Sequence, residues 1–182
     1  AHIYYLAAQE SENRQLTKFV KQVADHFNDR SPAIDTWPEA FEYLAECLQR
    51  EAAIVAIDEF PYLVDSNDSI PSYLQSFVDE RLAETESMLI LCGSSIGVME
   101  SEVLGHESPL YGRRSVQIDL QPFSFGDARL AIQYDDITEA IRTYAVTGGT
   151  PMYLTRFDYE RSFGDNVRAE VLSPTSLLYT EP

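Results

Sequence analysis

Apolar positions along the first two-thirds of the chain alternate between two patterns. Short continuous runs predict strands at His2–Leu6, Ala52–Ile57 and Met88–Cys92. Between them, apolar residues spaced at helical intervals predict two amphipathic helices, one over Leu16–Phe27 and one after Thr36. Thr36 and Glu39 form a capping box at the start of the second helix. A third helix begins at Pro71. Strands that alternate with helices predict an α/β fold, with three layers around a mostly parallel sheet.

Two further features complete this pattern. Ala52–Ile57 does not alternate with polar residues, which predicts a strand buried on both faces. Ser115–Leu120 does alternate and predicts a last strand. We expect an α/β core over residues 1–121 and a small helical region over 122–182, because only helical patterns follow Pro122: Phe125–Ile132, Ile137–Thr147, Met152–Phe157 and Phe163–Leu172.

Charge excludes several classes of function. The 182 residues include 30 acidic and 13 basic side chains, a net charge of −17, and the lysines are Lys18 and Lys21. Such a surface repels phosphate backbones and anionic lipids, so we expect no direct nucleic-acid binding and no membrane binding by this segment. The apolar runs are too short to span a bilayer. Cys47 and Cys92 lie in apolar segments, which predicts that both are reduced thiols in the core of a cytoplasmic protein.

The strand Ala52–Ile57 ends in two carboxylates, Asp58 and Glu59. Ligands of open α/β sheets bind at the carboxyl ends of the strands. Because adjacent residues of a strand point to opposite faces, the two side chains need different roles. In a nucleotide-hydrolysing site Asp58 would hold Mg²⁺ and Glu59 would orient or deprotonate a water. The alternative is a strand that ends in two solvated acids.

Small hydroxyl side chains follow the next predicted strand. Ser94 and Ser95 could hydrogen-bond a water or a γ-phosphate beside the two carboxylates. The alternative is a glycine–serine turn in which Ser95 caps a helix that starts at Ile96.

Two adjacent arginines, Arg113 and Arg114, precede the last predicted strand. The planar guanidinium fork suits phosphate oxygens. The alternative is a surface ion pair with one of the many carboxylates.

Near the C-terminus, Gly148, Gly149, Thr150 and Pro151 are explained by local structure alone. Glycine after the last turn ends one helix, and proline in the first turn starts the next.

Taken together, these features resemble the archaeal ATPase family, P-loop NTPases of the AAA+/STAND type. The resemblance implies that Asp58 and Glu59 are the Walker B pair and that Ser94 or Ser95 is the sensor-1 residue. It also implies that Arg113 or Arg114 is an arginine finger acting on a neighbouring subunit, and that the tail from about Phe123 is the helical lid. The matching stretches are Ile3–Ala7, Ala56–Leu63, Leu91–Glu100, Ser108–Arg114 and Tyr144–Leu154.

The chain departs from the family pattern in three places. It contains no GxxxxGK[ST] loop to cradle phosphates, and neither lysine follows a glycine. The family's C-terminal winged-helix part does not follow Pro182, and Met152 stands where some AAA+ relatives have a lid arginine. We therefore expect a fragment that lacks the first strand and the Walker A loop. Without that central strand, Ser115–Leu120 is expected to be poorly paired, shifted or paired with another chain.

The resemblance implies a parent protein that hydrolyses ATP with Mg²⁺ to drive conformational change. The chain would be its Walker B-to-lid portion, inactive alone and without tight binding of either cofactor. Expected partners are other copies or flanking domains of the parent. The alternative is a non-hydrolysing regulatory or protein-interaction module with an ATPase-like fold. With an archaeal relationship, the acid excess also predicts a halophilic host, because salt screens the repulsion between carboxylates.

Overall fold

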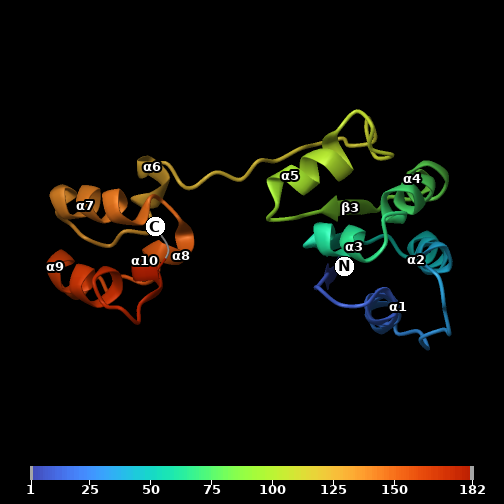
Figure 1. Cartoon of the computed structure of the whole chain (residues 1–182), viewed down its shortest axis with the longest axis horizontal. Coiled ribbons are helices and arrows are strands. Elements are labelled where there is room, and N and C mark those ends of the chain that lie inside the picture. Colours follow the sequence, from blue (N-terminus) through green and yellow to red (C-terminus); the bar gives the residue numbers. More distant parts are fainter. Residues whose placement is uncertain (1, 181–182) are drawn as a thin grey trace. The chain divides into compact units, whose positions relative to one another are not determined.

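A computed structural model describes residues 2–180, with the side chains at positions 96, 98, 102 and 104 excepted. The chain divides into two compact units, with the boundary in the sequence between Gln117 and Ile118 (Figure 1). The first contains all the strands found in residues 2–180, and the second is helical. Each unit is described below by itself.

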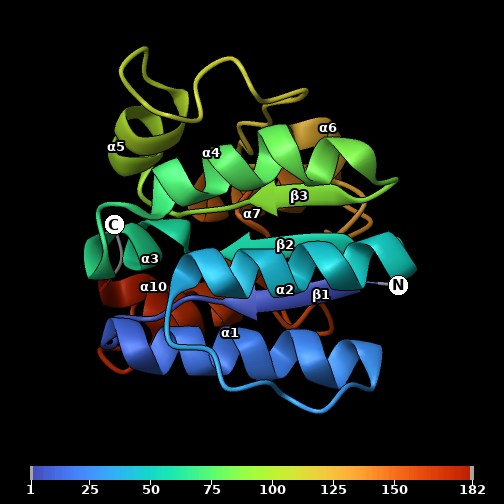
Figure 2. The same cartoon turned by 90° about the vertical axis from the view of Figure 1, so that its right-hand side faces the viewer.

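The first unit is built on a parallel sheet of three strands, β1 (His2–Leu6), β2 (Ile54–Asp58) and β3 (Met88–Leu91). Their order in the sheet is β1-β2-β3 (Figure 2). The register aligns Tyr4 with Ala56 and Ala56 with Ile90. The three strands and the parallel sheet are as the apolar runs predict.

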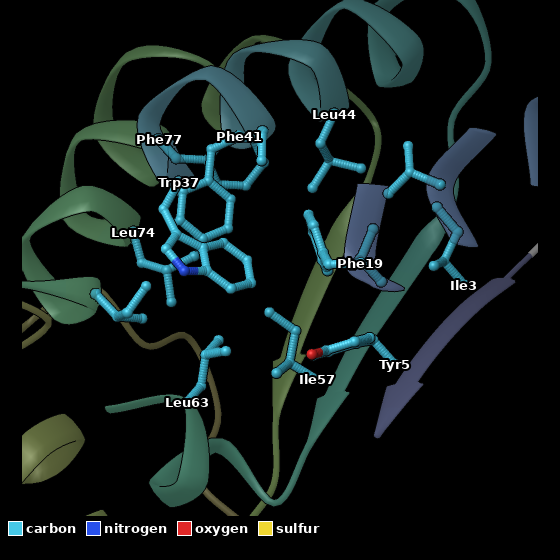
Figure 3. Packing of buried hydrophobic residues seen from close by; sticks show 14 of the residues in the cluster. Ile3, Tyr5, Phe19, Trp37, Phe41, Leu44, Ile57, Leu63, Leu74 and Phe77 are labelled. Carbon is cyan, nitrogen blue, oxygen red and sulfur yellow. The ribbon is translucent and has the colours of Figure 1, made fainter. Parts of the chain in front are cut away.

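Three long helices cover one face of this sheet: α1 (Glu12–Phe27), α2 (Trp37–Arg50) and α4 (Ile70–Glu80) (Figure 2). The hydroxyl of Thr36 accepts a hydrogen bond from the Glu39 amide, so the predicted N-cap of α2 is confirmed. Between the helices and the sheet lies an aromatic cluster (Figure 3). Its rings are in contact at centroid distances of 5.3–5.8 Å and belong to Tyr5, Phe19, Trp37, Phe41 and Phe77.

The opposite face of the sheet is apolar and uncovered within this unit. Burial alternates along β2, so the prediction of a strand buried on both faces is wrong for the unit as described. The physical reason is that the three long helices all pack on one side. The large side chains of the uncovered face are 38–56% exposed: Tyr4, Leu6, Ile54, Met88 and Ile90.

The two edges of the sheet differ. Beside β1, the carbonyl oxygen of Tyr4 accepts a hydrogen bond from the side chain of Gln22 on α1. A groove runs along this edge and is lined in part by Lys18 and Lys21. Lysines and occupied backbone groups are two ways in which proteins discourage pairing at an exposed edge. Beyond β3, no further strand pairs with the sheet among residues 2–180.

Shorter elements connect the sheet to the rest of the first unit. They are α3 (Phe60–Ser66), η1 (Leu82–Glu84, a 3₁₀ turn), α5 (Ile96–Met99) and η2 (Glu100–Leu104, a π-helical turn). Cys47 is buried as predicted, but Cys92 is exposed. The prediction for Cys92 is wrong because this residue follows the last residue of β3 and belongs to the loop at the end of the sheet.

The segment Ser115–Leu120 is not a strand. Its alternating side chains Val116, Ile118 and Leu120 are 73%, 75% and 88% exposed. Alternation indicates a strand only where a partner strand completes the hydrogen bonds, and the described residues supply none here. Within the described residues the segment is therefore unpaired, and its pairing with another chain stays a prediction.

The second unit is a small helical body. Its core comprises Ala128, Ile132, Tyr134, Ala140 and Leu154. The elements are α6 (Phe125–Ala128), α7 (Ile137–Thr147), α8 (Pro151–Leu154), α9 (Phe163–Asn166), η3 (Val167–Val171, a π-helical turn) and α10 (Leu177–Thr180). The helical tail is confirmed, with shorter first and third helices than the apolar pattern predicts. Within residues 2–180, no helix has both the length and the apolar character needed to cross a bilayer.

Two glycines connect α7 to α8. Gly148 is the left-handed C-cap of α7, and Pro151 opens α8, as predicted. Gly149 has a φ of +78°, and a Cβ atom on it would lie 2.2 Å from the carbonyl oxygen of Phe123. The Phe123 amide donates to the Gly149 carbonyl at 3.0 Å, and the Tyr144 hydroxyl donates to the Phe123 carbonyl at 2.9 Å. Gly149 thus holds the start of this unit against α7.

Candidate functional site

The carboxyl ends of β2 and β3 are joined by backbone hydrogen bonds that continue past the strands. The Cys92 amide donates to Ile57 at 2.9 Å, and the Phe60 amide donates back to the Cys92 carbonyl at 2.8 Å. These bonds bring the loop that contains Ser94 beside the two carboxylates that follow Ile57. The close approach follows from parallel pairing, since both strands end at the same edge of the sheet.

Asp58 is half-buried and its two carboxylate oxygens have different partners. Oδ1 accepts the Glu59 amide at 2.9 Å, and Oδ2 accepts the hydroxyl of Tyr4 from the neighbouring strand β1. The hydrogen bond to the Asp58 carboxylate is the main reason that the pKa of Tyr4 is raised. The orientation of the Asp58 carboxylate is therefore fixed from two sides.

Glu59 lies at a sharp change of chain direction. Its backbone is left-handed, with φ of +52° and ψ of +43°, which is unusual for a residue with a side chain. This conformation turns the chain from β2 into α3, which has Pro61 in its first turn. Non-glycine residues in such conformations cluster at functional sites. The carboxylates of Asp58 and Glu59 contact different neighbours.

The neighbour of Glu59 is Ser94. The Ser94 hydroxyl donates to Glu59 Oε2 at 3.1 Å, and the Ser94 amide donates to the same oxygen at 3.4 Å. Ser95 is exposed, and its carbonyl oxygen accepts the Met99 amide at the start of α5. The structure therefore brings together Asp58, Glu59 and Ser94, whereas Ser95 directly precedes α5 and contributes its carbonyl oxygen to the first turn of that helix.

Gly93 allows this contact. A Cβ atom at Gly93 would lie 2.7 Å from Cδ of Pro61 and 2.9 Å from Sδ of Met99. The loop after β3 therefore packs directly on the first turn of α3. The sequence alone indicates only a turn at Gly93, because the close approach to Pro61 involves a residue 32 positions away.

Arg113 is held by α4. Its Nε and Nη2 atoms donate to the two carboxylate oxygens of Asp79 at 2.8 Å each, and Nη1 donates to the Pro109 carbonyl at 2.8 Å. The guanidinium group lowers the pKa of Asp79 by hydrogen bonding. This arrangement is the ion pair of the alternative interpretation. Arg114 is exposed.

The oxygen atoms of Asp58, Glu59 and Ser94 are of the kind that Mg²⁺ prefers. Among the residues that the structure describes, no three His, Cys, Asp or Glu side chains form a complete metal-binding cluster. A cation at this site would therefore depend on further ligands, such as water or phosphate oxygens. Lys18, which donates to Glu10 at 2.6 Å, lies with Lys21 along the β1 edge.

Comparisons with known proteins agree with the α/β fold. A solved structure of a Walker-type ATPase from Pyrococcus abyssi superposes with a TM-score of 0.66 at 17% identity, over 92% of this chain and 60% of that one. The Orc1 protein of Aeropyrum pernix, solved in complex with DNA, gives a TM-score of 0.60 at 16% identity, over 92% of this chain and 49% of that one. At these identities the likeness concerns the fold.

Sequence comparisons add the family. An uncharacterized protein of Methanocaldococcus jannaschii is 30% identical over 180 residues, which is 99% of this chain and 38% of that protein. The chain thus spans well under half the length of this relative. Residues 1–157 match the profile of an ATPase domain predominantly from Archaea. The chain belongs to this archaeal ATPase family.

Proposed function

We propose that the chain is the Walker B-to-lid portion of a Mg²⁺-dependent ATPase. Asp58 would bind the Mg²⁺ of Mg-ATP, and Glu59 would orient and deprotonate the attacking water. The observation that carries this proposal is the grouping of Asp58, Glu59 and Ser94 at the carboxyl end of the parallel sheet. Two solvated acids would not need a strained backbone at Glu59 or a hydroxyl partner from the next strand.

Ser94 is the better candidate for the sensor role. Its hydroxyl already contacts the Glu59 carboxylate at 3.1 Å, and a hydroxyl can donate to only one acceptor at a time. A γ-phosphate that competes for this donor would release Glu59 toward the water. Ser95 has its place at the start of α5 instead.

We propose that Arg113 or Arg114 is the arginine finger that acts on the nucleotide of a neighbouring subunit. The donors of Arg113 are directed to Asp79 and to backbone carbonyls, where they hold the loop before residue 114 against α4. For Arg113 to take that role, its ion pair with Asp79 would have to open. The helical second unit, from Ile118 onward, would be the lid of the same subunit.

The phosphate-binding loop would come from outside these 182 residues. The sequence contains no GxxxxGK[ST], and the chain spans 38% of its curated relative and 60% of the Walker-type ATPase. ATP binding would require that loop, so the chain alone would bind ATP and Mg²⁺ weakly. The uncovered apolar face of the sheet supports contact with flanking parts of a longer cytoplasmic protein or with other copies.

The test uses the longer protein that contains this chain. Glu59→Gln should abolish ATP hydrolysis and leave ATP binding intact, because the amide keeps the shape of the carboxylate but cannot accept the proton of water. Glu84→Gln, an exposed position in η1, is the matched control and should hydrolyse ATP normally. Turnover that persists in Glu59→Gln would remove Glu59 from the role of base.

The second candidate, a non-hydrolysing interaction module, is favoured by the same apolar sheet face. The coding sequence upstream of Ala1 separates the two candidates. A GxxxxGK[ST] motif there supports the ATPase, and a wild-type long protein that neither carries the motif nor hydrolyses ATP supports the interaction module.

A further inference from the structure

Two adjacent tyrosines of β1 have different surroundings. Tyr5 is 2% exposed, belongs to the aromatic core, and its hydroxyl donates to the Gln15 carbonyl at 3.2 Å. Tyr4 is 49% exposed on the uncovered face and lies outside that core cluster. Its hydroxyl donates to Asp58 Oδ2. Packing in the core therefore accounts for an aromatic side chain at position 5, but it does not account for the one at position 4.

The contact between the Tyr4 hydroxyl and the Asp58 carboxylate follows from the register of the sheet. β1 pairs with β2 so that Leu6 stands opposite Asp58, and Tyr4 stands two residues earlier on the same face. Side chains of strands lean along the strand direction, so a long tyrosine side chain reaches a diagonal neighbour. In a parallel pair this diagonal places the phenol at the carboxyl end of the sheet.

The bond has a specific effect on Asp58. The Glu59 amide occupies Oδ1, and the Tyr4 hydroxyl occupies Oδ2. A carboxylate offers about four lone-pair sites, so both oxygens keep acceptor capacity after these two bonds. What the bonds remove is rotation of the carboxylate group. The remaining lone pairs are thereby held in one direction.

We propose that Tyr4 is a positioning residue, which holds the Asp58 carboxylate in the orientation that binds a divalent cation. This inference rests on the proposed function, in which Asp58 is the cation ligand. Partners that hydrogen-bond a ligating carboxylate typically change metal affinity by about 10–100-fold when they are removed. Tyr4 acts through Asp58 and does not itself contact the cation.

The experiment measures Mn²⁺ binding by the 182-residue chain, with free Mn²⁺ followed by electron paramagnetic resonance. Mn²⁺ is titrated into the millimolar range, because the chain alone is expected to bind the cation weakly. Tyr4→Phe keeps the ring and removes the hydroxyl, and it should weaken Mn²⁺ binding by about tenfold or more. Tyr5→Phe is the matched control, because it removes the neighbouring hydroxyl on the opposite face. It should lower the melting temperature and leave the Mn²⁺ affinity unchanged, whereas Tyr4→Phe should leave the melting temperature nearly unchanged.

Asp58→Asn separates the two proposals. Loss of Mn²⁺ binding in Asp58→Asn together with unchanged binding in Tyr4→Phe would overturn the role of Tyr4 and leave the role of Asp58 intact. Mn²⁺ binding that survives Asp58→Asn, or that is absent from the wild-type chain, would overturn the cation site itself. A parallel loss of affinity in Tyr4→Phe and Tyr5→Phe would also contradict a specific role for Tyr4.

Discussion

The second unit should depend on Gly149 far more than on the adjacent Gly148, although both have positive φ angles. An alanine in the left-handed conformation costs roughly 1–2 kcal/mol at either position. At Gly148 the new Cβ atom meets nothing within 4 Å, so the conformational cost is the whole effect. At Gly149 the Cβ atom would lie 2.2 Å from the carbonyl oxygen of Phe123, so the backbone there must move.

That movement breaks two hydrogen bonds. They are the Phe123 amide to the Gly149 carbonyl, at 3.0 Å, and the Tyr144 hydroxyl to the Phe123 carbonyl, at 2.9 Å. Each contributes about 0.5–1.5 kcal/mol net, so their loss adds about 1–3 kcal/mol to the conformational cost. Gly149→Ala should therefore destabilise the second unit by about 2–5 kcal/mol, against about 1–2 kcal/mol for Gly148→Ala.

Hydrogen exchange followed by mass spectrometry measures this difference locally, on peptides from α7 and α8. Opening free energies that differ by about 1.4 kcal/mol give exchange rates that differ tenfold, so Gly149→Ala should exchange about 5–150 times faster than Gly148→Ala in these peptides. Peptides from the first unit should exchange as in the wild type. Equal exchange in the two variants would refute the argument from close approach.

Three other outcomes follow from charge and burial. Because Arg113 lowers the pKa of Asp79, their ion pair stabilises the fold above the ordinary aspartate pKa of about 4 and is lost as the pH falls through the lowered folded value. Asp79→Asn should therefore lower the urea denaturation midpoint at pH 7 but leave it nearly unchanged in acid, where the wild-type ion pair is also lost. An equal decrease of the midpoint at both pH values would contradict a stabilising ion pair. Burial raises the pKa of Tyr5, so its neutral form stabilises the fold fully below about pH 10 and progressively less above it. Urea midpoints should fall less between pH 8 and pH 10.5 in Tyr5→Phe than in the wild type, and an equal fall would argue against this cause. With a net charge of −17, the chain should melt at a higher temperature in molar KCl than in low-salt buffer, and equal melting temperatures would count against salt adaptation.

Local patterns in the sequence predict most of the first unit. The periodic apolar residues of α1, α2 and α4 and the apolar runs of β1, β2 and β3 are visible because each element buries a repeated face. Thr36 and Pro151 mark helix starts through interactions within one turn. By contrast, α3 has only seven residues, too few for a helical repeat to stand out, and it was not predicted.

What the sequence could not predict depends on residues far apart in the chain. The bond from Tyr4 to Asp58 spans 54 positions and exists because of the sheet register. The ion pair of Arg113 with Asp79 spans 34 positions. Ser115–Leu120 shows the converse case, in which a local pattern is present but the strand is absent, because strand formation needs a partner.

The hydrogen bond of Gln22 to Tyr4 has a consequence for assembly. An association that joined β1 of one copy to β3 of the next would repeat without closing and would grow into a fibre. With the β1 edge occupied by Gln22 and flanked by lysines, β3 is the edge of the described sheet that is open to pairing. Copies that meet through β3 alone must be related by a two-fold axis, so their strands run antiparallel and the assembly ends at two. Gln22 and the two lysines beside it thus disfavour open-ended growth of this sheet through its β1 edge.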